Sequence, residues 1–378
     1  MQYAPLRAEI EQVIRDVCDS QRFVLGPRVS QLEEQVAAYC RSTHGVGVSS
    51  GTDALLLALM ALDIAPGDEV ITSPFTFFAT AGVIARLGAR PLFCDIDEDT
   101  FNLSPAAVEA AIAGQCDRSG DRLVNRRTGG IVKAMMPVHL YGQMADMRSL
   151  NRIARVHRLV VIEDAAQAIG AAYGDLHAGS SGDVGCLSFF PTKNLGAFGD
   201  AGMCVTNSEG LAQRMKILRV HGGEPKYYHS LIGGNFRLDE LQAAILLVKL
   251  KHLEGWTHAR QRNAAHYDRL IEAADLSAVI RRPYRAPEAR HVFNQYVIRT
   301  PRRDELRKHL ETAGIGTEVY YPLPLHQQKC FAYLGHDPDD FPNSRAAAAE
   351  VLALPIFPEL TIEQREHVIR EIGRFFQP

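Results

Sequence analysis

The chain has 378 residues, more than one hydrophobic core usually supports, so its length favours two domains. Hydrophobic residues make up 46% of it and charged residues 22%, which excludes a disordered or fibrous chain. The 41 basic and 44 acidic residues leave a net charge of -3 and form no dense basic block, so nucleic acid is not an expected partner.

The sequence shows no targeting or membrane signal. Its first twenty residues carry scattered charges where a secretion signal needs an apolar stretch, so we expect a cytoplasmic protein. The longest apolar run, 54–62, is about half a membrane span, which predicts a buried helix and no membrane partner. Seven widely spaced cysteines without a C-x-x-C pair predict reduced thiols, with Cys186 and Cys204 in the core, and we expect no metal site.

Short apolar runs alternate with helical patterns from about residue 45 to residue 207. The runs are continuous, as expected for a parallel sheet with helices on both faces. They predict strands at 46–50, 68–73, 90–97, 131–142 and 158–166. Ligands of such sheets gather beyond the carboxyl ends of the strands, so polar residues after these runs are site candidates. The polar, glycine-rich segment 114–131 interrupts the pattern and is predicted to be a surface loop.

A helical pattern from Leu238 to about residue 274 leads out of this core. Beyond it, we expect a smaller α/β unit. It comprises a strand at 293–300, a helix at 303–314, a strand at 316–322 and an amphipathic helix at 361–376. The predicted fold class is therefore α/β, with a mostly parallel central sheet sandwiched by helices and a smaller C-terminal α/β domain. We place the large domain at 1–250 and the small domain at 251–378.

Two of the polar candidates follow predicted strands. Asp164 ends the fifth run, where a helix cap, a salt bridge and a carboxylate for a cationic ring nitrogen all fit. Ser50, Gly51 and Thr52 precede a helix whose N-terminal N–H groups can bind a phosphate, although capping also explains them. The glycine spacing matches neither the dinucleotide motif nor the nucleoside triphosphate motif.

An aromatic residue and a lysine complete the set. Three aromatics in 72–80 follow the second strand, and either all of them pack in the core or one stacks on a flat ligand. Lys193 lies in the loop "SFFPTKNLGAFGD", and lysine amines form Schiff bases once desolvation or a neighbouring cation lowers their pKa. A phosphate turn, an acid, an aromatic ring and a lysine are together what pyridoxal 5'-phosphate needs.

The stretches "IEDAAQAIGA" and "GDVGCLSFFPTKNLGAFGDAGMCVTN" resemble the DegT/StrS family of nucleotide-sugar aminotransferases, in the fold-type I class of pyridoxal-phosphate enzymes. Further segments follow in family order over nearly the whole chain, among them "SSGTDALLLAL", "HLYGQ", "GGNFRLDELQAAIL" and "YYPLPLHQQ".

The resemblance implies catalytic roles for Lys193, which would form the Schiff base, and for Asp164, which would pair with the pyridine nitrogen. The other cofactor contacts that it implies are Gly51, Thr52, Phe77, Gln167, Ser188 and Asn235. Because the matching asparagine reaches the phosphate from the neighbouring subunit, it also implies a homodimer with shared active sites. The implied substrate contacts are Arg237, Tyr321 and His326. Tyr320 and Tyr321 are adjacent, so on a strand only one of them would face the site.

The implied activity is transfer of an amino group, with glutamate as donor, to a keto group of a nucleotide-linked sugar. Three alternatives remain. One is amination of a keto cyclitol, which the sequence leaves open. Another is a sugar dehydratase, in which histidine replaces the lysine, so Lys193 argues against it. The third is a regulatory protein without turnover, which the intact set of Lys193, Asp164 and Ser188 disfavours.

Overall fold

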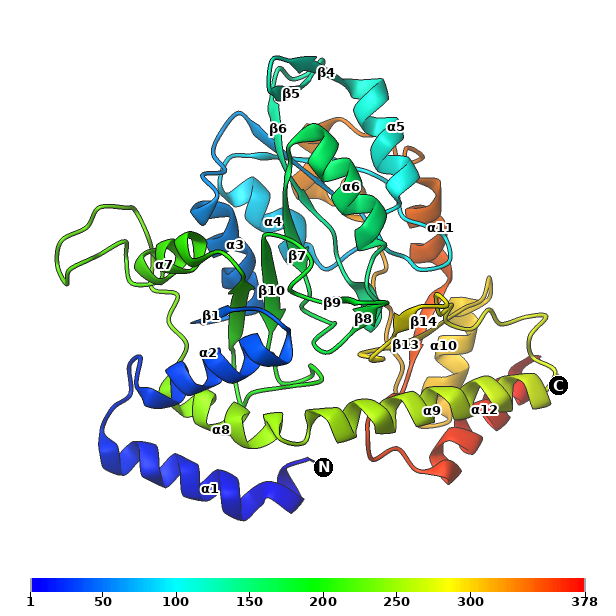
Figure 1. Cartoon of the computed structure of the whole chain (residues 1–378). Coiled ribbons are helices and arrows are strands. Elements are labelled where there is room, and N and C mark those ends of the chain that lie inside the picture. The colour runs from blue at the N-terminus through cyan, green and yellow to red at the C-terminus, as the bar shows by residue number, and fades with distance from the viewer. Residues whose placement is uncertain (1, 377–378) are drawn as a thin grey trace.

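The computed structural model describes residues 2–376 and is built around a mixed central sheet (Figure 1). The main path of this sheet runs through β1 (His44–Val48), β11 (Gly202–Thr206), β10 (Val184–Ser188), β7 (Val160–Asp164), β6 (Ile131–Met136), β2 (Asp68–Thr72) and β3 (Arg90–Phe93). Along this path β11 runs antiparallel to both of its neighbours, and the pairs from β10 to β3 are parallel. The predicted mostly parallel α/β sheet is confirmed.

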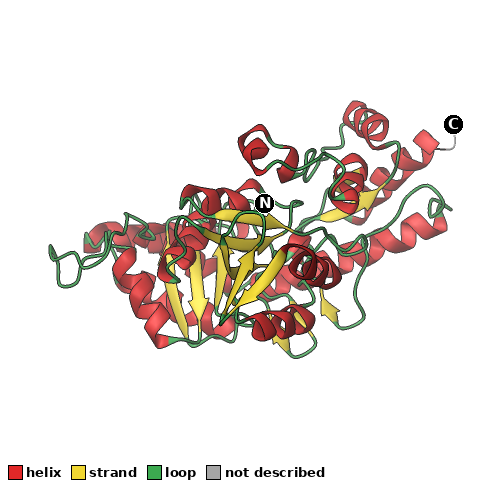
Figure 2. Cartoon of the chain, turned by 90° about the horizontal axis from the view of Figure 1, so that it is seen from above, coloured by secondary structure: helices red, strands yellow, loops and turns green. Residues whose placement is uncertain are grey.

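Helices cover both faces of the sheet (Figures 1 and 2). One face packs against α3 (Gly51–Ala61), α4 (Phe78–Arg86) and α7 (Glu209–Leu218). The other packs against α2 (Pro27–Tyr39), α5 (Pro105–Gln115), α6 (Met147–His157) and α8 (Glu240–Leu250), and α1 (Tyr3–Ser20) lies outside α8. Neighbouring strand residues face opposite clusters, as Val161 and Ile162 do in β7. Residues on both faces of each strand therefore need apolar side chains, which explains why the apolar runs in the sequence are continuous.

The segment 114–131 is not a surface loop, so that prediction was wrong. It contains a hairpin of β4 (Cys116–Ser119) and β5 (Arg122–Asn125), and β5 pairs antiparallel with β6. Gly120 adopts the left-handed conformation in the turn, with a φ of 60°. Leu123 and Asn125 point inward, and the Asn125 side chain donates to Glu69 Oε2 at 2.8 Å. The hairpin therefore extends the sheet.

The C-terminal part contains α9 (Leu253–Ala273), α10 (Arg303–Thr312), α11 (Pro342–Glu350), α12 (Ile362–Phe376) and the strand pair β13 (Tyr296–Arg299) and β14 (Val351–Leu354). The long predicted helix is two helices, since α8 ends at Leu250 and α9 begins at Leu253. The expected strand at 316–322 is wrong: in this segment Glu318 forms an isolated bridge to Ala353. A small sheet of β8 (Ala172–Tyr173), β9 (Leu176–His177) and β12 (Ala289–Arg290) lies apart from these strands.

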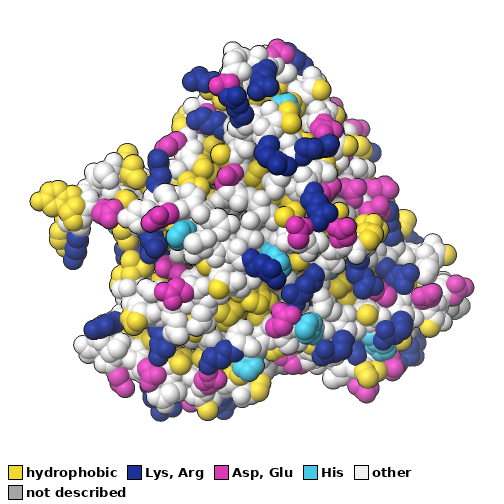
Figure 3. Space-filling model, viewed as in Figure 1, with side chains coloured by type: hydrophobic (Ala, Val, Ile, Leu, Met, Phe, Trp, Pro, Cys, Tyr) yellow, Lys and Arg dark blue, Asp and Glu magenta, His cyan; other side chains and the backbone are white. Residues whose placement is uncertain are grey.

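Surface features agree with the composition. Figure 3 shows Lys, Arg, Asp and Glu side chains interspersed over one face of the molecule. Across residues 2–376, no helix combines the length and the apolar character that crossing a membrane requires. All seven cysteines are free, and Cys186 and Cys204 are buried opposite each other in β10 and β11, as core residues.

Candidate active site

A cavity of about 540 Å³ opens at the carboxyl edge of the sheet. Parallel strands end together at this edge, so the connections that follow β1, β2, β7 and β10 meet here. The connection after β10 is the lysine loop, residues 189–201, which returns directly into the antiparallel strand β11. The Phe189 N–H donates to the Ala201 carbonyl at 2.8 Å, so both ends of this loop are held side by side.

Lys193 lines the cavity from the middle of the lysine loop. Its backbone N–H donates to the Phe190 carbonyl at 2.8 Å, which closes a tight turn at this point. Burial lowers the pKa of the Lys193 amine to about 8, while the negative charge of Asp164 opposes the shift. Burial therefore raises the fraction of neutral amine, the nucleophilic form, above that of an exposed lysine.

Asp164, the last residue of β7, is 5% exposed and lines the same cavity. Its Oδ2 accepts a hydrogen bond from the Thr80 hydroxyl at 2.7 Å, and its Oδ1 accepts one from the Ala166 N–H at 3.2 Å. Burial raises the pKa of Asp164, and these two hydrogen bonds and the Lys193 charge act against that rise. Within residues 2–376, no cationic side chain lies at ion-pair distance from Asp164.

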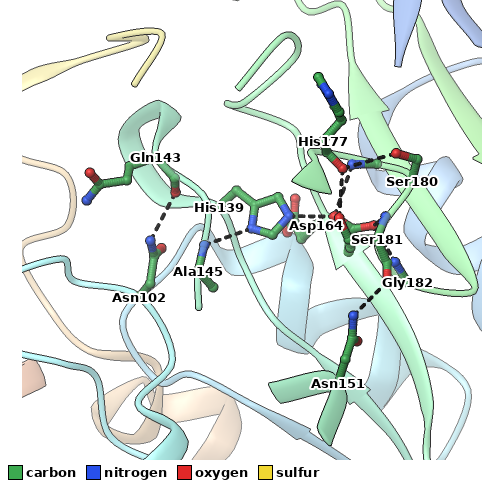
Figure 4. A network of polar contacts seen from close by, with 12 residues as sticks. Asn102, His139, Gln143, Ala145, Asn151, Asp164, His177, Ser180, Ser181 and Gly182 are labelled. Carbon is green, nitrogen blue, oxygen red and sulfur yellow. Dashed lines mark hydrogen bonds and ion pairs between the residues drawn. The ribbon is translucent and has the colours of Figure 1, made fainter. Parts of the chain in front are cut away.

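Glu163 precedes Asp164, and strand alternation points its side chain to the opposite face of the sheet. There it joins a buried network with His139, Ser181 and Gly182, which Figure 4 labels. Its carboxylate accepts three backbone N–H groups from the turn at 179–182 and lies 2.7 Å from His139 Nε2. The Ala145 N–H donates to His139 Nδ1 at 3.2 Å, so Nδ1 carries no proton and Nε2 donates to Glu163. The His139 backbone N–H donates to the Asp164 carbonyl at 3.0 Å, which ties this network to the end of β7.

A cup for an anion forms where α3 begins. Ser50 caps this helix, since its hydroxyl accepts the Asp53 N–H at 3.0 Å. A Cβ on Gly51 would lie 2.6 Å from the Ser188 Cβ, so only glycine allows α3 and β10 to approach this closely. Thr52 is exposed and lines the cavity beside them. Gly51, Thr52 and Ser188 therefore come together at a helix N-terminus, where N–H groups favour a phosphate.

Aromatic side chains form another wall of the cavity. The Phe77 side chain is 56% exposed, and its ring centroid lies 6.1 Å from that of Tyr321. Gln167 is held in orientation because its Oε1 accepts the Tyr141 N–H at 2.7 Å and its Nε2 donates to the Tyr321 hydroxyl at 3.2 Å. Tyr320 and Tyr321 both line the cavity, so the expectation that only one faces it was wrong. The alternation argument failed because this segment is not a regular strand.

The remaining predicted residues lie elsewhere. Asn235 and Arg237 line a neighbouring hollow of about 400 Å³, which meets the main cavity at Asp200. His326 lines neither hollow: it is 4% exposed, and its ring centroid lies 4.8 Å from that of Phe341. The structure thus separates these three residues from the lysine and the carboxylate.

The residues of the cavity fit pyridoxal 5'-phosphate. The Lys193 amine suits its aldehyde, and the buried Asp164 carboxylate, which forms no ion pair within residues 2–376, suits its pyridinium nitrogen. The cup at Gly51 suits its phosphate. Gln295 also lines the cavity, and its buried Oε1 has no hydrogen-bond partner among the residues that the structure describes. Fold and cavity together define a fold-type I pyridoxal-phosphate enzyme.

Comparison with known proteins gives the family. Residues 5–373 match the model of the DegT/DnrJ/EryC1/StrS aminotransferase family, and the chain belongs to this family. It is therefore an aminotransferase with pyridoxal phosphate as cofactor, which confirms the resemblance seen in the sequence.

Similar proteins span the whole chain. A pleiotropic regulatory protein of Geobacillus stearothermophilus is 51% identical, over 100% of this chain and 96% of its own length. A UDP-N-acetyl-3-dehydro-alpha-D-glucosamine 3-aminotransferase of Acidithiobacillus ferrooxidans is 43% identical, over 98% and 95%. The crystal structure of S. venezuelae DesV with a ketimine intermediate superposes with a TM-score of 0.92 at 40% identity, covering 100% of this chain and 96% of DesV.

Sequence reasoning missed Thr80, His139 and Glu163. Thr80 and Asp164 are 84 positions apart, and His139 and Glu163 are 24 apart, so no local spacing connects either pair. The available signal was the pair of acids, Glu163 and Asp164, at the end of one strand. Because strand residues alternate between faces, Glu163 must point away from the cavity, and a buried carboxylate on that side needs a partner.

Proposed function

We propose that the chain transfers an amino group from glutamate to a keto group of a nucleotide-linked sugar. The observation that carries this proposal is the lining of one cavity by the Lys193 amine, the Asp164 carboxylate and the cup at Gly51. The substrate class is supported by the Acidithiobacillus relative, which is named for a UDP-linked keto sugar, and by a dTDP-sugar transaminase of Streptomyces venezuelae that is 42% identical.

The residues of the cavity would divide the work of holding the cofactor. When bound, pyridoxal phosphate supplies an electron sink for the negative charge that develops on the substrate carbon. The Asp164 carboxylate would keep the ring nitrogen protonated, which strengthens that sink. The N–H groups at Gly51 and Thr52 and the Ser188 hydroxyl would hold the phosphate. Phe77 would cover one face of the ring and exclude water from it.

Lys193 would carry the proton between the two reacting carbons. Its amine would take up a proton from the substrate carbon as a base and then give the proton up as an acid. A group that acts first as base and then as acid works best when its pKa lies close to the working pH. The pKa of Lys193, lowered to about 8 by burial, supports this role.

We further propose a homodimer in which Asn235 reaches the phosphate of the partner subunit. The segment between α7 and α8 projects from the body of the protein (Figure 1), and Figure 3 shows hydrophobic side chains at its tip. Its exposed residues include Tyr227, Tyr228 and Ile232, and Asn235 follows them on the surface. Exposed apolar groups gathered in this way favour contact with another protein surface. Light scattering on the purified chain tests the dimer, and a monomer at working concentration would exclude it.

Borohydride reduction of the purified chain with pyridoxal phosphate tests the function. We expect the cofactor to be fixed to the peptide that contains Lys193, and Lys193→Ala to prevent this fixation. Glutamate should bleach the cofactor band of the unreduced enzyme, and a keto sugar nucleotide from a panel should restore it. Restoration by a keto cyclitol alone would replace the proposed substrate class. No fixation at any lysine would overturn the proposal and favour the regulatory alternative.

A further inference from the structure

Helix α8 holds the lysine loop through two side chains. Gln242 and Lys249 are seven positions apart on this helix, so they project from the same face. Gln242 Oε1 accepts the Phe198 N–H at 2.9 Å, and the Lys249 amine donates to the Gly196 carbonyl. The loop that carries Lys193 is therefore gripped at two points by one helix.

Lys249 is a buried cation in an apolar setting. It is 5% exposed, and its Nζ lies 5.7 Å from the ring centroid of Phe198 and 5.9 Å from that of Trp256. Within the described residues 2–376, no carboxylate lies at ion-pair distance from it. Burial lowers its pKa to about 8, while the negative charge of Glu359 opposes the shift. Because burying an ammonium group without a paired carboxylate is costly, methionine or leucine would stabilise this position better unless the amine has a role.

The lysine loop is tightly folded around Gly196, three positions after Lys193. A Cβ on Gly196 would lie 2.4 Å from the Pro191 carbonyl oxygen, so the backbone is folded tightly back on itself at this point. Between Gly196 and Lys193, the Asn194 side chain donates to the Val292 carbonyl at 3.0 Å. This short and tightly folded stretch is the path through which we expect the position of the Gly196 carbonyl to affect Lys193.

We propose that Gln242 and Lys249 form a clamp that positions Lys193, with Lys249 as a positioning residue for the aminotransferase reaction. Neither side chain lines the main cavity, so the clamp acts through the loop and not on the substrate. The inference rests on the proposed role of Lys193 as the lysine that binds the cofactor.

The test is Lys249→Met, with Lys251→Met as the matched control. Lys251 lies just beyond the end of α8, is exposed and pairs with Glu9 on the surface. In the full chain loaded with pyridoxal phosphate, we expect amide hydrogen exchange of the peptide at 190–200 to become about tenfold faster in the Lys249 variant, because a charge-assisted hydrogen bond is lost. The pH at which the Schiff-base absorbance titrates should also shift in this variant, and Lys249→Arg should restore part of both properties.

The proposal is overturned if Lys249→Met and Lys251→Met show the same exchange at 190–200 and the same absorbance titration. If Lys249→Met does not fold, Gln242→Ala replaces it as the test. We then expect faster amide exchange at Phe198, and unchanged exchange there would overturn the proposed clamp. A wild-type chain that borohydride does not label at Lys193 refutes the proposed function instead, whatever the exchange data show. The two failures are therefore distinguishable.

Discussion

Replacing Lys193 with methionine should stabilise the cofactor-free protein near neutral pH. The pKa of this amine falls from 10.5 to about 8 because burial disfavours its charged form. Between these two values the unfolded chain binds more protons than the folded one, so the wild-type protein gains stability as the pH rises through this window. Below about pH 8 the whole burial penalty is present, and methionine removes it while filling similar space.

The magnitude follows from the two pKa values. The difference between 10.5 and about 8 corresponds to roughly 3 kcal/mol of free energy of unfolding. This value is the upper limit for Lys193→Met at about pH 7, because methionine forms no new polar contact in the cavity. At about pH 10 most of the advantage should disappear, since the wild-type amine is then neutral in the folded protein.

Urea unfolding of both cofactor-free proteins at the two pH values measures this difference. The result that refutes the reasoning is a difference in unfolding free energy that stays the same at both pH values. Such a result would mean that the Lys193 amine is solvated. Burial would then not lower its pKa, and it could not be the reason that this amine is nucleophilic. A variant less stable than the wild type at about pH 7 would refute it equally.

Three further predictions concern the cavity and the network behind it. Gly51→Ala places a methyl group 2.6 Å from the Ser188 Cβ and should weaken pyridoxal-phosphate binding by about tenfold or more, measured by fluorescence titration. Asp164→Asn should lower kcat by roughly 10²–10³ in steady-state assays, while borohydride still fixes the cofactor. His139→Ala leaves a buried carboxylate without its side-chain partner and should cost about 3 kcal/mol in urea unfolding.

Each of these variants has a control or a contradicting outcome. Gly255→Ala adds a methyl group with no atom within 4 Å and should leave cofactor binding unchanged. If Asp164→Asn retains wild-type kcat, the carboxylate does not act on the ring nitrogen. His258→Ala removes an exposed histidine paired with a surface glutamate and should change stability by less than about 1 kcal/mol. Equal losses in the two histidine variants would contradict the importance of the buried network.

The sequence predicted those parts of the fold whose side chains are buried on both faces. The runs that contain β1, β2, β3, β6 and β7 were identified as strands for that reason, although the predicted strands at 90–97 and 131–142 extend past the ends of β3 and β6. The strands β10 and β11 were missed, although they are as long as β1 and contain fewer glycines than it does, so length and glycine content do not explain the omission. The β4–β5 hairpin was missed because its exposed edge is charged. The break between α8 and α9 contains neither proline nor glycine, so packing and not local sequence places it.

The candidate site divides in the same way. Asp164 and the turn at Gly51 were found because each follows a predicted strand, and parallel strands bring their ends to one edge. Lys193 was found from its chemistry and from the family motif around it, since the strand that precedes it, β10, was missed. Thr80 and Lys249 were not found, because their partners lie 84 and 53 positions away and nothing local marks them. His326 was carried over from the resemblance, and the structure places it among aromatic side chains instead.

The lysine loop begins and ends on adjacent antiparallel strands, and the hydrogen bond between Phe189 and Ala201 closes it at its base. In a loop closed in this way, residues between the two ends can change while both ends stay fixed by β10 and β11. The resemblance implies that a dehydratase would carry histidine at position 193, so a change inside this one loop would separate the two chemistries. The sheet and the Asp164 carboxylate lie outside the loop and would not need to change.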